Sequence, residues 1–141
     1  MNAECRIESD STIFRFCVTR KGFDDCGYSW TDAVITVNNS YFNYKTSNEF
    51  LEFREMASMF NKLEALLSNT LTEVYRMEFI EPDVQIVFNP RHEEFGDIVA
   101  EFFFYPFLDG ALTEQHYVLP LYRDDIEELV TYLSDMIDKL K

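Results

Sequence analysis

The sequence has few of the residue types on which catalytic and cofactor-binding sites depend. Its 141 residues include two histidines, three cysteines and four glycines. Four glycines leave little material for a phosphate-binding loop, and neither a G-x-G-x-x-G nor a Walker pattern occurs. Cys5, Cys17 and Cys26 are odd in number and widely spaced, which argues against a disulfide framework or a metal quartet. We therefore expect reduced thiols, no metal and no cofactor.

Long hydrophobic runs and positive charge are also scarce. No apolar run approaches the roughly 20 residues of a membrane span, and the first ten residues are too polar for a signal peptide, so we expect a cytoplasmic protein. Lys and Arg number 12 against 26 Asp and Glu, giving a net charge of −14. Nucleic acids and anionic membranes require clustered Lys and Arg, so we expect neither as a partner. The acidity favours a basic protein partner, although it can also serve solubility alone.

The few reactive side chains form no recognisable catalytic group. His92 lies in a polar, charged segment and His116 in a predicted strand, and neither has a second His or a Cys at zinc-ligand spacing. A cysteine nucleophile needs a histidine base, and the sequence pairs no cysteine with either histidine. Adjacent carboxylates such as Glu93 and Glu94 are expected by chance in so acidic a chain. We therefore predict that the protein is not an enzyme.

Aromatic and hydrophobic residues, in contrast, are abundant at 16% and 47% of the chain, enough for the core of a single domain over residues 1–141. Alternating apolar residues predict strands, and short connections containing Pro or Gly favour an antiparallel meander. The predicted strands are Cys5–Val18 (one strand, or two broken near Ser9–Ser11), Trp30–Val37, Tyr41–Lys45, Val74–Ile80, Asp83–Asn89, Asp97–Phe107 and Glu114–Leu121.

Two segments have the three-to-four-residue apolar spacing of amphipathic helices, Glu49–Ser68 and Arg123–Leu140. Thr46 with Glu49, and Asp124 with Glu127, have the spacing of capping boxes, and Ser47 or Asn48 are alternative caps for the first helix. The predicted fold is therefore α+β: an antiparallel, meander-like sheet of about six or seven strands with two amphipathic helices packed on one face.

The predicted strand Asp97–Phe107 is apolar on both faces. Its odd-numbered face is mostly apolar and its even-numbered face entirely so between Ile98 and Phe104. Such a strand is either covered on both sides or leaves one face for a partner. Ordinary burial is the favoured interpretation.

Several features follow one another in a distinctive order. A strand with Phe14 and Phe16 precedes a strand led by Trp30 and the Leu-rich helix Phe50–Leu67. The segment Phe79–Ile86, which contains Glu81-Pro82, leads to two more strands and the helix Asp125–Leu140. This order resembles small bacterial immunity proteins of the WapI-type family, which protect a cell from toxin domains delivered by contact with neighbours. The resemblance implies inhibition by binding, no shared catalytic residues, and toxin contacts that vary between members.

Two functional hypotheses follow. The first is an immunity protein that occludes a basic toxin domain, with carboxylates imitating phosphates and aromatic side chains anchoring the contact. The alternative is a small acidic secretion chaperone that holds an effector segment as a dimer; the sequence leaves monomer and homodimer open. The segment Gly22–Gly27, with two glycines and two aspartates, is predicted to be a loop. The candidate contacts for the toxin are Asp24, Asp25 and Asp32 in and beyond this loop, and Glu93, Glu94, Asp97, Glu101, Phe103 and Tyr105 in and beside the predicted strand Asp97–Phe107.

Overall fold

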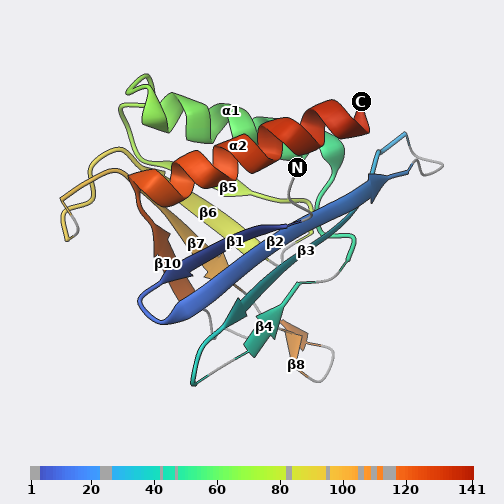
Figure 1. Cartoon of the computed structure of the whole chain (residues 1–141), viewed down its shortest axis with the longest axis horizontal. Coiled ribbons are helices and arrows are strands. Elements are labelled where there is room, and N and C mark those ends of the chain that lie inside the picture. The colour runs from blue at the N-terminus through green and yellow to red at the C-terminus, as the bar shows by residue number, and fades with distance from the viewer. Residues whose placement is uncertain are drawn as a thin grey trace.

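The alternating segments of the sequence form two antiparallel sheets, with two helices along one side of the pair (Figure 1). A computed structural model describes residues 4–22, 27–41, 43–46, 48–81, 84–94, 96–104, 107–108, 111–112 and 117–141. The first sheet has the order β1-β2-β3-β4 and the second the order β10-β7-β6-β5. In chain order the elements are β1 (Cys5–Ser9), β2 (Thr12–Lys21), β3 (Thr31–Asn38), β4 (Asn43–Lys45), α1 (Phe53–Leu67), β5 (Tyr75–Glu78), β6 (Val84–Asn89), β7 (Val99–Phe104), the hairpin β8 (Phe107–Leu108) and β9 (Ala111–Leu112), β10 (Tyr117–Leu121) and α2 (Arg123–Leu140).

The α+β class and the antiparallel meanders are confirmed, but the prediction of one sheet of six or seven strands is wrong. Eight of the described strands divide into two sheets of four, and β8 and β9 pair only with each other. Helix α1 separates β4 from β5 along the chain. A half-buried strand shows only that one of its faces is covered. The covering layer here includes a second sheet, so the period-2 pattern could not distinguish one sheet from two.

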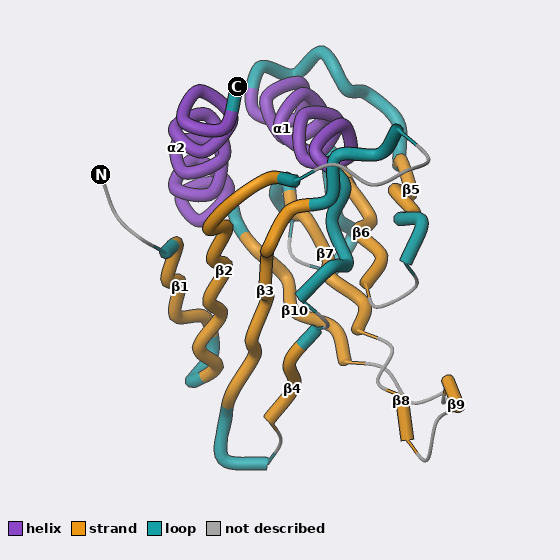
Figure 2. Tube along the Cα trace, turned by 90° about the vertical axis from the view of Figure 1, so that its right-hand side faces the viewer, coloured by secondary structure: helices purple, strands orange, loops and turns teal. Residues whose placement is uncertain are grey.

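Aromatic side chains join the layers. The rings of Phe14 on β2 and Phe102 on β7 lie with centroids 5.3 Å apart, and Tyr44 on β4 contacts Phe104 on β7 at 5.0 Å. Phe16 packs edge-on against Tyr132 of α2 at 5.7 Å. All six side chains are buried. The core therefore lies between the two sheets and continues beneath the helices, which run side by side in Figure 2.

The predicted break near Ser9–Ser11 separates β1 from β2. Asp10 and Ser11 both have positive φ, 50° and 63°, as a two-residue type I′ hairpin requires. Ser9 therefore pairs directly with Thr12, and the register continues to Cys5 opposite Phe16.

The first helix begins later than predicted. Its N-cap is Glu52, and the capping box joins Glu52 to Glu55. The predicted cap Thr46 is buried instead and accepts a hydrogen bond from the Ile35 N–H at 3.0 Å. The following residues extend beside β3, where the Thr31 N–H donates to the Leu51 carbonyl at 3.0 Å. A capping-box spacing alone did not reveal that this segment completes a sheet edge.

The second helix has the predicted bounds, but its cap differs. Tyr122 is the N-cap, and its N–H donates to Asp125 Oδ2 at 3.2 Å, so the predicted pairing of Asp124 with Glu127 is wrong. Neither helix in the described part of the chain is long and apolar enough to cross a membrane.

Candidate protein-binding surfaces

The loop after β6 folds back onto the outer face of the second sheet. His92 Nε2 lies 2.7 Å from Glu101 Oε1 on β7, with both side chains largely covered. The Glu94 N–H donates to His92 Nδ1 at 3.1 Å, and the His92 N–H donates to the Asp97 carbonyl at 2.9 Å. Because Nδ1 accepts a hydrogen bond, Nε2 carries the proton that faces the Glu101 carboxylate. The loop thus brings Glu93, Glu94 and Asp97 to the same side of the sheet as Glu101.

These predicted contacts differ in how available they are. The exposed residues Glu93, Glu94 and Asp97 are accessible to a partner, whereas the Glu101 carboxylate is already held by His92. Phe103 is half-buried beneath the guanidinium of Arg76, which lies 5.7 Å from the ring centroid.

The outer face of β7 is largely covered, as the favoured interpretation of its two-sided apolar pattern predicts. Val99 is fully buried, and Val87 on β6, opposite Glu101, is nearly so. Tyr105 lies outside the described residues. The described part of this strand therefore offers little open apolar surface of the kind that a chaperone would use.

The remaining predicted contacts belong to the other sheet. Asp32 lies on β3 and forms an ion pair with Arg20 on β2. Asp24 and Asp25 lie outside the described residues. The described candidates therefore do not form one surface, because Asp32 is on the first sheet and the others are on the second.

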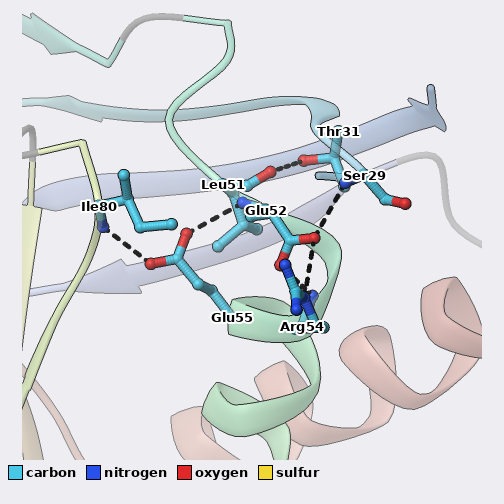
Figure 3. A network of polar contacts seen from close by, with 7 residues as sticks. All are labelled: Ser29, Thr31, Leu51, Glu52, Arg54, Glu55 and Ile80. Carbon is cyan, nitrogen blue, oxygen red and sulfur yellow. Dashed lines mark hydrogen bonds and ion pairs between the residues drawn. The ribbon is translucent and has the colours of Figure 1, made fainter. Parts of the chain in front are cut away.

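A buried acidic network lies at the start of α1 and holds three segments together (Figure 3). The Glu52 side chain is nearly inaccessible and accepts hydrogen bonds from the N–H groups of Ser29 at 3.0 Å and Arg54 at 2.8 Å. Glu55 accepts from the Glu52 N–H at 3.1 Å and from the Ile80 N–H at 2.9 Å. Burial raises the pKa of Glu55, and these two N–H donors oppose that rise. Each carboxylate is satisfied within the fold, so this network is structural.

The structure also contains an acidic groove that the sequence interpretation did not anticipate. It lies between β1 and α2 and has a volume of about 820 Å³. Cys5 and Tyr132, both buried, also line it, and the Tyr132 hydroxyl accepts a hydrogen bond from the Val18 N–H at 2.9 Å. We name this feature the α2 groove; its charged lining residues are Glu4, Arg6, Asp124, Glu127, Glu128 and Asp135.

The pKa values of two neighbouring groups report the negative field there. Burial raises the pKa of the Cys5 thiol to about 12, and the carboxylates of Glu128, Asp125 and Glu4 add to the shift. The pKa of Tyr122 is raised by burial first and then by nearby carboxylates. Those carboxylates are Asp10, Glu94 and Asp125, so acids of the β1–β2 turn and of the loop after β6 lie near the start of α2.

The positive side chains are distributed differently. The strand register places Arg6, Arg15, Thr36 and Lys45 in one row across the outer face of the first sheet. In the α2 groove, by contrast, five carboxylates accompany one arginine among the described lining residues. Within the described part of the chain, the charges are therefore distributed unevenly.

Comparison with known proteins adds to this geometry. A family model described as the immunity protein WapI-like family matches residues 6–141. The chain belongs to the WapI-like immunity protein family. No curated protein matches it. For a WapI-like immunity protein, the function is immunity, which implies a toxin protein as the partner.

One sequence signal for the α2 groove of this WapI-like protein was present. Asp124, Glu128 and Asp135 are spaced by four and seven residues, which places them along one helical face. The sequence interpretation used Asp124 only as a helix cap. The other wall could not be inferred, because no local pattern shows that the chain's first strand lies at a sheet edge beside its last helix.

Proposed function

We propose that this WapI-like protein neutralises a basic toxin domain in the cytoplasm by binding it and covering its working surface, without performing a reaction. The observation that carries this proposal is the crowding of exposed carboxylates in the α2 groove. Opposite charges steer two proteins together and disfavour wrong partners. A positively charged toxin domain, such as one that itself acts on nucleic acid, matches this surface.

The loop after β6 provides a second group of contacts in this proposal. Glu93, Glu94 and Asp97 are exposed there, and Glu94 contributes to the same negative potential at Tyr122 as Asp125 of α2. One toxin surface reaching from the groove to this loop would meet both groups. Asp32 and Glu101 are weaker candidates, because each already has a partner within the fold.

The proposal is tested by mixing the purified protein with the toxin domain encoded next to it. Size-exclusion chromatography with light scattering, at low and at moderate salt, measures both complex formation and the oligomeric state of the free protein. We expect a stable complex that weakens as salt increases, because ions screen exposed charges. If micromolar protein forms no complex at either salt concentration, the proposal is wrong. An obligate dimer of the free protein would favour the secretion chaperone instead.

A further inference from the structure

The first strand of the chain has a free edge. β1 pairs with β2, and no strand in the described part of the chain pairs with its other side. Ser9 and Thr12 flank the two-residue turn and so form a hydrogen-bonded pair, and alternation gives Ile7 and Cys5 the next bonded positions. The backbone N–H and C=O groups of the residues between them, Arg6 and Glu8, therefore point toward the free edge.

This edge opens into the α2 groove. At one end β1 approaches the second sheet, where the Ser9 hydroxyl donates to the Pro120 carbonyl at 3.4 Å. At the other end Glu4, Cys5 and Arg6 line the groove opposite α2. Figure 2 shows β1 as the outermost strand of the first sheet on the side where α2 lies. A short extended segment has room to lie beside β1 from this end.

The charges that line the groove indicate which side chains such a segment would carry. Asp124 and Glu128 are four residues apart on α2, a spacing at which like charges destabilise a helix. Arg6 is the one base among the described lining residues, and its guanidinium is bound to Glu8 at 2.6 Å. The groove therefore keeps an excess of carboxylates that a cationic ligand would offset.

We propose that the α2 groove binds a short extended segment of the toxin domain, rich in Lys and Arg, which adds to the free edge of β1 as a further strand. This inference rests on the proposed function and names the site and binding mode. The backbone groups of Arg6 and Glu8 supply the strand pairing. Side chains of an added strand alternate between two directions. Its basic side chains point toward α2, where Asp124, Glu127, Glu128 and Asp135 line the groove.

A proline substitution tests the strand pairing. Arg6→Pro removes an N–H that β2 does not use, and proline is tolerated on edge strands whose N–H faces outward. Arg6→Ala removes the same side chain and its ion pair with Glu8 but keeps the N–H, so it is the matched control. We expect Arg6→Pro to bind the toxin domain about tenfold more weakly than Arg6→Ala, the order expected for about 1.4 kcal/mol of lost pairing. Thermal unfolding checks that both variants are folded. If the two folded variants bind the toxin domain with equal dissociation constants, strand addition is wrong.

Paired charge reversals test the electrostatic half of the inference. Glu128→Lys with Asp135→Lys changes the groove, whereas Glu64→Lys with Glu73→Lys makes the same change in net charge at exposed positions elsewhere. We expect the groove pair to weaken binding about tenfold or more relative to the remote pair. If the two double variants bind equally well, the groove is not the site.

Hydrogen exchange locates the contact without any substitution. Strand addition predicts that the amides of Arg6 and Glu8 exchange more slowly in the complex than in the free protein. If amide exchange slows only in the Glu93–Asp97 loop, the groove is not the binding site and the toxin contacts that loop instead. If the wild-type protein binds the toxin domain and none of the groove substitutions weakens that binding, this inference is wrong while the proposed function stands. If the wild-type protein forms no complex, both are wrong.

Discussion

At the scale of single residues, Glu52 shows how an acidic chain uses a few of its carboxylates for structure. It is a buried carboxylate in a protein with a net charge of −14, and it is tolerated because hydrogen bonds from backbone and Arg54 donors satisfy it. The exposed acids of α2 have no comparable role within the fold. This difference separates carboxylates that hold the protein together from those available to a partner.

Removal of the Glu52 carboxylate should therefore be costly. Glu52→Ala removes the helix cap and leaves the half-buried N–H of Ser29 without its acceptor. We expect the free energy of unfolding to fall by about 2–3 kcal/mol, measured by urea denaturation. Glu64→Ala, on the exposed side of the same helix, should change it by less than about 0.5 kcal/mol. Equal effects of the two substitutions would contradict a structural role for Glu52.

Cys5 predicts an alkaline loss of stability. Its thiol has an ordinary pKa of 9.0 in the unfolded chain and about 12 in the fold, so the folded state binds more protons between these values. Stability is therefore complete below pH 9.0 and falls as the pH rises toward 12. Between pH 9.0 and pH 10.0, where ordinary tyrosines begin to ionise, this group should cost about 1 kcal/mol.

The measurement is urea denaturation under reducing conditions at both pH values, for the wild-type protein and for Cys5→Ala. The wild-type free energy of unfolding should fall by about 1 kcal/mol more than that of the variant. Parallel losses in the two proteins would show that the Cys5 thiol is not responsible.

At the scale of elements, the sequence predicted each strand's buried face better than it predicted how the strands assemble. The buried residues of β2, such as Phe14 and Phe16, and those of β6, such as Val84 and Ile86, follow the predicted alternation. The alternation of apolar and polar residues is a local pattern, so a single sequence is enough to predict it. The division into two sheets depends on contacts between distant segments, such as Phe14 with Phe102, and no local pattern encodes it.

The start of α1 was mispredicted for a similar reason. Thr46 and Glu49 have the spacing of a cap, but Thr46 bonds to Ile35 of β3 instead. Tertiary pairing therefore overrides the local signal. The α2 groove was missed because its two walls are the first strand and the last helix, at opposite ends of the chain.

The β1–β2 turn gives a prediction at this scale. Ser11 is exposed and has a φ of 63°, a left-handed conformation that side chains with a Cβ disfavour. Ser11→Gly should therefore raise the free energy of unfolding by about 0.5–1 kcal/mol. This gain is the backbone strain that glycine relieves, minus the cost of ordering glycine's greater conformational freedom in the unfolded chain. Ser11→Ala keeps the Cβ and should give no such gain in urea denaturation. A gain equal in both variants would contradict the explanation by strain.

At the scale of the whole molecule, the charge distribution connects the fold to the family. Both sheets contribute buried aromatic residues to a shared core, and exposed acids of α2 lie opposite the free edge of β1. The row of Arg6, Arg15 and Lys45 crosses the outer face of the first sheet, and its first member, Arg6, also lines the groove. This arrangement supports the proposal that one positively charged partner binds in one orientation.

The most direct test of the account is a titration of the toxin domain's own activity with this protein. Occlusion by binding predicts that residual activity falls in proportion to added protein and is abolished near one equivalent. It also predicts that activity returns when the complex is dissociated. Loss of activity at far below one equivalent would indicate a reaction rather than occlusion. Full activity in a saturated complex would show that binding does not neutralise the toxin, and either result would contradict the account.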